Sequence, residues 1–442
     1  MVKIAMIGAG SVVFCRTLVN DILNVRELQD CTFHLMDIDP ERLALVERLI
    51  KKIVSTEGLP TKVLATTDRK EALKDARYVV VMIQVGGVEA YRLDHEIPAK
   101  YGVDQCIGDT LGPGGVFRGL RSFPVLIELA KEMKTLSPPD ALLMNYSNPM
   151  AMNTWTIFDS SPVPVVGLCH GVQFTAEWMA KMIGAPLSEI DYWCAGINHL
   201  AWFLQFRRNG KDAYPELKRI LSDPETVARE NERVRCHMME HFGYFMTETS
   251  GHLSEYVPWY RKRKDLMNKY MGPAFGGESG FYLRLCEESL GKYLDDVSKQ
   301  VAGEKPARLT ARSSEYCSHI MEARETGRPF RFNGNVKNTG LITNLPEGCC
   351  VEVPCFVDRL GIHPAHVGNL PPHCAALCRS NVTVQELAVR GGMTGDRQLV
   401  FQAVLHDPLT AAVCGIDDVR QMVDELFAAE AEWLPQFRRK TA

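Results

Sequence analysis

The chain begins with an apolar strand that runs directly into a glycine turn and a helix. Residues 3–12 read Lys-Ile-Ala-Met-Ile-Gly-Ala-Gly-Ser-Val, and an apolar helical pattern follows at residues 18–23. Such a unit lets backbone N–H groups at a helix N-terminus approach a phosphate without Cβ clashes. It predicts an α/β fold with a doubly wound parallel sheet, in which a dinucleotide is bound by Gly8, Gly10, Ser11 and Val12.

A second apolar strand, at residues 33–36, ends in Asp37. An acid there can accept from both ribose hydroxyls and repel a 2′-phosphate, which predicts NAD rather than NADP. Val13 occupies the third glycine position of the fingerprint, so the motif is incomplete. A plain β-turn is the alternative, but the strand, turn, helix and second strand closing on an acid together favour a nucleotide site.

Composition excludes several function classes. The 442 residues are 46% hydrophobic, enough for two or three domains with sizeable cores. The formal net charge of −4 gives no global field that would recruit nucleic acid or an anionic membrane. No apolar run reaches the roughly 20 residues that span a bilayer, and no secretory signal is recognisable. We therefore expect a cytoplasmic protein that binds neither nucleic acid nor membrane.

Charged runs and cysteines carry no strong functional signal. The longest basic run, residues 261–264, is expected to be a solvated face, and residues 222–240 are expected to form an exposed helix. The fourteen cysteines are scattered and show no CxxC spacing, so we expect reduced thiols, mostly in the core.

Strands and helices alternate through the first third of the chain, as a doubly wound sheet requires. A helix is expected at residues 69–75, and strands at residues 62–66, 78–83, 141–146 and 163–168. Ligands bind outside the carboxyl ends of such strands. Polar residues that follow these ends should therefore converge on one crevice: Gln84, Asn145, Asn148, Cys169 and His170. Of these, Gln84 and Asn145 are expected to contact the cofactor.

The rest of the chain mixes helices with strand-like runs such as residues 350–357. We expect two domains: an NAD-binding Rossmann-like domain at residues 1–195 and an α+β domain for substrate binding and oligomerisation at residues 196–442.

A cysteine and a histidine suggest a second chemical site. Cys169 follows an expected strand, and His199 comes about thirty residues later. A thiolate and an imidazole can hold Mn²⁺, Fe²⁺, Co²⁺, Ni²⁺ or Zn²⁺ and leave positions open for substrate oxygens. From the residues alone, a buried cysteine and a core histidine are the competing interpretation.

Four blocks of sequence carry a family resemblance, at residues 107–115, 145–155, 167–173 and 196–202. They resemble the motifs of family 4 glycoside hydrolases, most closely those of melibiase-type α-galactosidases. The resemblance runs from the glycine turn through residues 345–354 and nearly to residues 433–435, so it covers almost the whole chain.

The resemblance implies a second domain like that of lactate and malate dehydrogenases, and a hydrolase that uses NAD⁺ without consuming it. In that chemistry the nicotinamide takes hydride from C3 of the sugar, and a divalent metal, Mn²⁺ or another transition metal, stabilises the enediolate after C2 deprotonation. Elimination then expels the aglycone from C1. Water adds across the resulting double bond, and the hydride returns to C3. The resemblance also implies a homodimer or homotetramer.

The resemblance assigns roles to individual residues. Cys169 and His199 match the metal ligands, with His199 also at the substrate, and Tyr256 matches the tyrosine that removes the C2 proton. Asn148 and Asn145 are expected to hold sugar hydroxyls and the nicotinamide ribose, and Asp109 to order the loop under the sugar. His170 stands where phosphoglycosidase members have an aspartate general acid, so it is the candidate catalytic group that protonates the leaving oxygen. The same difference argues against a 6-phosphosugar.

Several alternatives stay open. A neutral α-galactoside is the first expectation and an α-galacturonide or α-glucuronide the second, with a sulfoquinovoside third. A charged sugar would require a fixed cation, for which Arg92, Arg118 and residues 261–264 are candidates. A plain NAD-dependent hydroxy-acid dehydrogenase and a redox-sensing nucleotide-binding module are the alternatives from other function classes.

Overall fold

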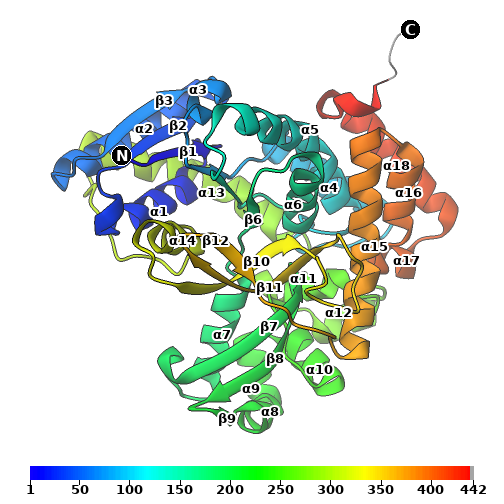
Figure 1. Ribbon diagram of the computed structural model, residues 1–442. Helices are drawn as coiled ribbons and strands as arrows, with labels where there is room; N and C mark the ends of the chain where they lie inside the picture. Colours follow the sequence, from blue (N-terminus) through cyan, green and yellow to red (C-terminus); the bar gives the residue numbers. More distant parts are fainter. Residues whose placement is uncertain (439–442) are drawn as a thin grey trace.

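The computed structural model describes residues 1–438, and one twelve-stranded sheet runs through it (Figure 1). One half of the sheet is parallel, as expected for a doubly wound fold. Its strands lie in the order β3 (Lys62–Thr66), β2 (Thr32–Met36), β1 (Lys3–Ile7), β4 (Tyr78–Val81), β5 (Leu142–Asn145) and β6 (Val165–Gly167). The strands predicted in this half are confirmed, with ends that differ by one or two residues.

The other half of the sheet is antiparallel and continues directly from β6. Its order is β10 (Phe330–Lys337), β11 (Cys350–Asp358), β7 (Ile190–Ile197), β8 (Leu200–Arg208) and β9 (Lys211–Asp212), and β12 (Gly361–Pro364) pairs with β11. In Figure 1 the gold strands β10 and β11 lie between the blue parallel strands and the green strands β7 to β9. The division predicted between residues 195 and 196 falls inside β7, and it stays a prediction.

Side chains of the parallel strands alternate between two helical layers because successive residues of a strand face opposite sides. On β1, Ile4 and Met6 belong to the core shared with α1 (Val12–Leu23) and α2 (Pro40–Thr56). Ala5 and Ile7 belong to a separate core on the other face, formed with α3 (Arg69–Leu73), α5 (Gly112–Leu136) and α6 (Met150–Ser160).

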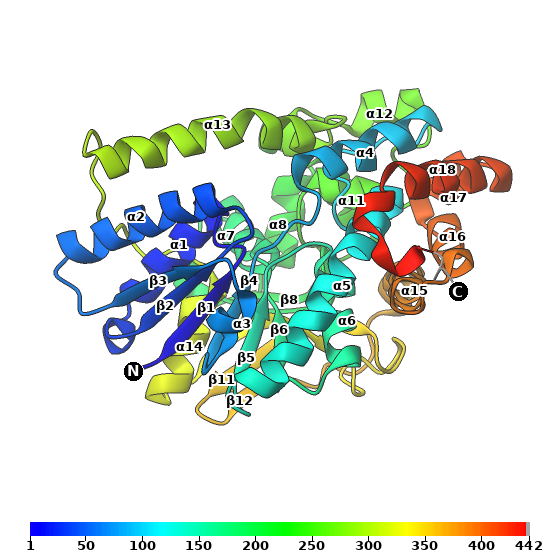
Figure 2. The same ribbon diagram turned by 90° about the horizontal axis from the view of Figure 1, so that it is seen from above.

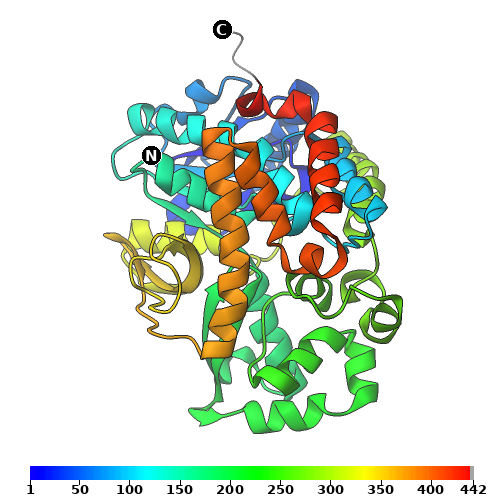
Figure 3. The same cartoon turned by 90° about the vertical axis from the view of Figure 1, so that its right-hand side faces the viewer.

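Helices from the second half of the chain pack back onto the first half. The long helix α13 (Phe281–Ala302) packs along α2 and α4 (Gly87–Lys100), and Figure 2 shows it lying across this side of the molecule. Helix α14 (Tyr316–Thr326) contacts α1. On the other side, α15 (Pro372–Thr394) packs against α5 and α6, beside α16 (Arg397–Leu405), α17 (Pro408–Val413) and α18 (Ile416–Ala429) (Figure 3).

Six short α-helices lie between β6 and α13 in the chain. They are α7 (Gly171–Met182), α8 (Tyr214–Leu221), α9 (Pro224–Glu230), α10 (Arg233–Phe242), α11 (Ser250–Tyr256) and α12 (Lys264–Tyr270). The single exposed helix expected at residues 222–240 is wrong. Asn231 adopts a left-handed conformation (φ 61°) that separates α9 from α10, and α10 buries Arg235 against Glu232.

Two compositional expectations can be compared with this fold. All fourteen cysteines are free, and twelve of them are buried, which confirms the expectation of reduced core thiols. Within residues 1–438, no helix has the length and apolar character needed to cross a membrane.

Candidate active site

The glycine turn after β1 closes onto the end of β2. The Gly10 N–H donates to Oδ2 of Asp37 at 2.7 Å, and the Gly8 N–H donates to the Met36 carbonyl at 2.9 Å. A Cβ on Gly10 would lie 2.8 Å from that Asp37 oxygen, so this close approach requires glycine. Helix α1 begins directly after Ser11. The backbone of Val12 forms its first residue, and the side chain of Val12 lies outside the described part of the chain.

Two further predicted cofactor residues lie at neighbouring strand ends. Gln84 is exposed after β4 and donates to the Gly87 carbonyl at 3.0 Å. Asn145 is fully buried at the end of β5, where its side chain accepts from the Ser147 N–H at 3.0 Å and donates to Thr154 Oγ1 at 3.3 Å. Asn145 therefore fixes the turn that carries Asn148.

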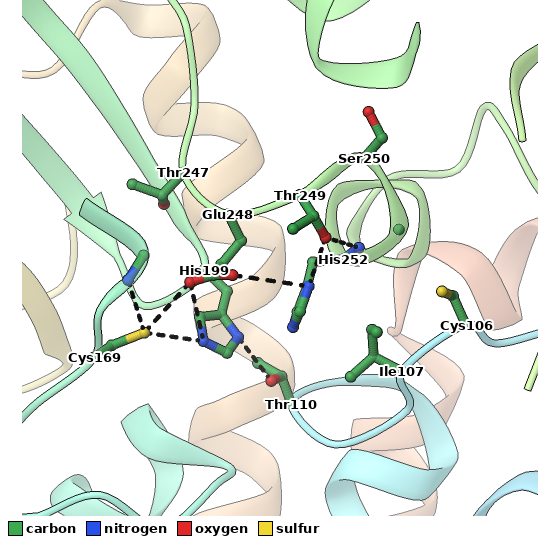
Figure 4. A network of polar contacts seen from close by, with 12 residues as sticks. Cys106, Ile107, Thr110, Cys169, His199, Thr247, Glu248, Thr249, Ser250 and His252 are labelled. Carbon is green, nitrogen blue, oxygen red and sulfur yellow. Dashed lines mark hydrogen bonds and ion pairs between the residues drawn. The ribbon is translucent and has the colours of Figure 1, made fainter. Parts of the chain in front are cut away.

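Cys169, after β6, lies beside His199, in the turn between β7 and β8, and Glu248, just before α11 (Figure 4). Sγ of Cys169 is 3.3 Å from Nε2 of His199 and 3.5 Å from Oε1 of Glu248. Nε2 of His199 and Oε1 of Glu248 are 4.0 Å apart. These three ligand-type side chains are close enough together to surround one metal ion.

A relay of hydrogen bonds orients the His199 ring. Thr110 Oγ1 donates to Oδ1 of Asp109 at 2.7 Å and lies 2.9 Å from Nδ1 of His199. Because a hydroxyl has a single proton, Thr110 must accept from Nδ1–H of His199. Nε2, which faces Cys169, therefore keeps its lone pair, as a metal-binding imidazole needs.

The tyrosine and the amide predicted at the substrate join the same cluster. Tyr256 is 1% exposed at the end of α11, and its phenol oxygen is 3.4 Å from Nδ1 of His199. Asn148 Nδ2 donates to Oδ2 of Asp109 at 2.8 Å. The structure thus brings together Asp109, Asn148, Cys169, His199 and Tyr256.

Burial shifts the pKa values of three groups in this cluster. It lowers the pKa of His199 to about 4, so the ring is neutral at neutral pH. Burial, followed by the Asp109 charge, raises the pKa of Tyr256 well above its usual value. Burial, followed by the Glu248 charge, likewise raises the pKa of the Cys169 thiol. A cation bound between these groups would reverse both effects, because it stabilises thiolate and phenolate.

His170 lies at the edge of this cluster, and within the described residues its side chain makes no hydrogen bond to Cys169, His199 or Tyr256. It occupies the N-cap position of α7, and Nδ1 of its half-exposed ring is 3.1 Å from Oε1 of Glu315. Burial lowers the pKa of His170, but the hydrogen bond to Glu315 and the charge of Glu248 outweigh it and leave the pKa raised.

Two residues of the cluster were missed from the sequence. Glu248 and His252 are four residues apart, and Oε2 of Glu248 lies 3.9 Å from Nδ1 of His252. Their signal was a carboxylate and an imidazole at helical spacing immediately before Tyr256. Thr110 also carries part of the site, beside the predicted Asp109.

Comparison with known proteins identifies the family of this chain. The family described as "Family 4 glycosyl hydrolase" matches residues 3–185, and its C-terminal domain matches residues 194–410. An α-galactosidase of Rhizobium meliloti (strain 1021) is 46% identical over 98% of this chain and 89% of the relative. An α-galactosidase of Bacillus subtilis (strain 168) is 40% identical over 99% of this chain and 100% of the relative. An α-galacturonidase of the same Bacillus strain is 28% identical over 92% of this chain and 93% of the relative.

Solved structures show the same fold. A 6-phospho-α-glucosidase from gut microorganisms, in complex with NAD and Mn²⁺, aligns with a TM-score of 0.82 at 22% identity, over 99% of this chain and 100% of that one. A malate dehydrogenase from Plasmodium falciparum with NADH aligns with a TM-score of 0.51 at 13% identity, over 90% and 99% of the two chains. The expected fold class, a Rossmann-like sheet followed by an α+β part, is confirmed. With both family regions matched in order across one continuous sheet, the chain belongs to the family 4 glycosyl hydrolases.

Proposed function

We propose that this protein hydrolyses α-galactosides with the help of NAD⁺ and a divalent metal ion such as Mn²⁺. The observation that carries the proposal is the convergence of Cys169, His199 and Tyr256 within one buried cluster. The α-galactosidases that are 46% and 40% identical to this chain support the choice of sugar.

The residues present fit both bound groups. The Gly10 N–H and the Asp37 carboxylate lie at the strand ends where a pyrophosphate and a ribose are held in this fold. The buried thiol and imidazole of Cys169 and His199 are donors that suit a divalent transition metal. When bound, NAD⁺ supplies a reversible hydride acceptor for C3 of the sugar, and the metal ion supplies Lewis-acid stabilisation of negative charge at C2 and C3.

The protein side chains position the sugar and move its protons. Asn148 and Asp109 are bonded to each other, so their remaining capacity can orient a sugar hydroxyl beside His199. Tyr256 removes the C2 proton once C3 is a ketone. His170, at the edge of the cluster and held by Glu315, donates a proton to the departing oxygen.

A buried arginine favours an α-galacturonide as the second candidate substrate. Arg118 is 9% exposed, donates to the Asn148 carbonyl at 3.2 Å, and lies over the ring of Tyr91. Its Nη1 is buried and has no hydrogen-bond partner within the described residues, and no carboxylate there lies within 4.0 Å of its guanidinium. Such a cation can pair with a uronate carboxylate.

The other candidate cations already have partners. Arg92 pairs with Glu287 on the surface. Arg261 is 2% exposed and bonded to Asp104 and Ser254, so the expectation of a fully solvated basic run is wrong for this residue. The buried charge of Arg261 is therefore paired inside the protein and is not free to bind a substrate carboxylate.

Release of p-nitrophenol from the α-galactoside, the α-galacturonide and the α-glucuronide tests the proposal, with and without NAD⁺ and Mn²⁺ under reducing conditions. NADH absorbance is followed in parallel. The expected result is cleavage that requires both additions and leaves no net NADH, fastest with the galactoside. Steady NADH accumulation without cleavage would overturn the proposal in favour of a dehydrogenase.

A further inference from the structure

We propose that Glu248 supplies a third protein ligand, beside Cys169 and His199, to the metal ion of this site. The role of Glu248 rests on the proposed function, because that function assigns the ion to Cys169 and His199. A carboxylate ligand would turn a two-residue site into a mixed sulfur, nitrogen and oxygen site.

The spacing of the three ligand atoms fits one ion. Metal bonds to nitrogen and oxygen are about 2.0–2.2 Å long, and bonds to sulfur are about 2.3 Å, so two ligands of one ion lie about 3–4 Å apart. The sulfur-to-nitrogen, sulfur-to-oxygen and nitrogen-to-oxygen distances in the cluster are 3.3, 3.5 and 4.0 Å. Figure 4 shows Cys169, His199 and Glu248 pointing toward one another from three separate segments.

The first residue of α7 leaves room for the carboxylate. A Cβ on Gly171 would overlap Oε1 of Glu248 and lie 2.8 Å from its Cδ. The Gly171 N–H also points to Sγ of Cys169, 3.4 Å away. Glycine at this position therefore lets Glu248 reach the thiol while the backbone N–H contributes to the same sulfur.

The charge of Glu248 lacks a permanent cationic partner. Its side chain is 9% exposed, and within residues 1–438 its ion-pair neighbours are the imidazoles of His199 and His252, at 4.0 and 3.9 Å. No lysine or arginine of this part of the chain lies within 4.0 Å of its carboxylate. A carboxylate so largely removed from water requires a compensating charge. One divalent cation would balance both the Glu248 carboxylate and the Cys169 thiolate.

A second cluster of ligand-type groups, Asp109, His199 and His252, shares one residue with the first. The ligand-type atoms of this second cluster already have hydrogen-bond partners. Nδ1 of His199 is bonded to Thr110, and the Asp109 oxygens accept from Thr110 and Asn148. The free nitrogen of His199 is the one that faces Cys169 and Glu248, so the ion belongs with those two residues.

Metal binding by the full-length, EDTA-treated protein with NAD⁺ present tests the role of Glu248. Electron paramagnetic resonance of free Mn²⁺ gives the affinity directly, without an activity assay. Glu248→Gln is expected to weaken Mn²⁺ binding roughly 100-fold or more, since loss of an outer-shell partner alone costs about 10–100-fold. Because carboxylates suit Mn²⁺ whereas thiolates suit Zn²⁺, the same variant should also shift the preference of the site toward Zn²⁺.

Gly171→Ala provides a matched variant that removes no ligand. Alanine is a better helix former than glycine at the start of α7, so this variant should not destabilise the helix. It should still bind Mn²⁺ more weakly, because its Cβ would displace the Glu248 carboxylate. Glu248→Asp keeps the charge but shortens the reach, and it should bind Mn²⁺ with intermediate affinity. Glu240→Gln, on the exposed surface of α10, is the control for net charge and should bind like the wild type.

Unchanged Mn²⁺ affinity in folded Glu248→Gln, with affinity lost in Cys169→Ser, would overturn the role of Glu248 and leave the proposed function standing. Loss of Mn²⁺ affinity in His252→Asn but not in Cys169→Ser would place the ion in the second cluster. That result would also overturn the proposed role of Glu248. Absence of Mn²⁺ binding by the wild-type protein would instead contradict the proposed function itself.

Discussion

The phenol oxygen of Tyr256 lies 3.4 Å from Nδ1 of His199, while the other nitrogen of that imidazole faces Sγ of Cys169 at 3.3 Å. The proposed base and the proposed metal site are thus separated by one aromatic ring. A cation on Nε2 would act on the phenol across that ring, which offsets the burial that raises the pKa of Tyr256.

Tyr256→Phe is expected to lower kcat by about 100- to 10,000-fold, the usual contribution of a general base. KM should change little, because the phenol contributes to proton removal rather than to binding. Solvent deuterium incorporation at C2 of the sugar, followed by NMR, should disappear with the activity. Tyr260→Phe, whose hydroxyl is bonded to His237, is the matched control. Deuterium incorporation at the wild-type rate in Tyr256→Phe would contradict the assignment.

Thr110→Val is expected to weaken Mn²⁺ binding by about 10- to 100-fold, because outer-shell partners orient the ligands that they touch. The substitution keeps the shape of the side chain and removes the hydroxyl that accepts from Nδ1–H of His199. Calorimetric titration with Mn²⁺ measures the change. Thr383→Val, at a half-buried position on α15 where the threonine hydroxyl donates to the Arg379 carbonyl, should have no effect on the affinity. An equal affinity for Thr110→Val and wild type would show that the relay does not orient His199.

Asp37→Asn is expected to weaken NAD⁺ binding by about tenfold, since hydrogen bonds to a charged acceptor contribute about 1.5–3 kcal/mol and Asn retains part of them. The preference for NAD⁺ over NADP⁺ should fall more strongly, because repulsion of the 2′-phosphate is lost. Gly10→Ala should weaken both cofactors together, as its Cβ would lie 2.8 Å from Oδ2 of Asp37. Titration of each variant with NAD⁺ and with NADP⁺ gives the two dissociation constants, whose ratio distinguishes lost preference from general weakening. An unchanged preference in Asp37→Asn would remove this residue from the ribose site.

Glu352→Gln is expected to flatten the dependence of stability on pH. Glu352 is 1% exposed on β11, and burial, followed by the charge of Glu248, raises the pKa of this carboxyl from 4.5 to about 8. The folded protein then keeps a proton that the unfolded chain releases above pH 4.5. The stabilisation is complete at low pH and is lost as pH rises through about 8, with a slope of at most about 1.4 kcal/mol per pH unit.

Urea unfolding between pH 5 and pH 9 in EDTA measures this effect. The free energy of unfolding should fall more steeply with pH for the wild type than for Glu352→Gln. Parallel curves for the two proteins would show that Glu352 ionises normally.

The parallel half of the fold was predictable because buried strands appear as short apolar runs and glycine turns follow them. Cys169 and Asn148 could be placed near one crevice because the carboxyl ends of parallel strands meet. Their proximity to His199 and Tyr256 came from the family resemblance, since nothing local joins residues from such distant segments.

Other features depend on partners that are distant in sequence. The sequence predicts that Arg261 is part of a charged surface run. In the structure Arg261 is buried, pairs with Asp104 and donates to the Ser254 hydroxyl. Glu248 is placed by the segment before α11, where Met246 bridges to Trp202 on β8, and by the missing side chain of Gly171. No periodicity in the chain encodes those two contacts.

Strand β10 has a consequence for how the two halves of the sheet are held together. Asn335 on β10 pairs with Gly167 on β6, which lies 168 positions earlier in the chain. The two halves of the sheet therefore join through residues that are far apart in sequence. Cys169 follows β6 on one side of this junction, and His199 and Glu248 come from the segment between the two strands. An ion held by these three residues, as proposed above, would connect the segment after β6 to the segments after β7 and before α11. Such an ion would add its binding free energy to the stability of the folded sheet.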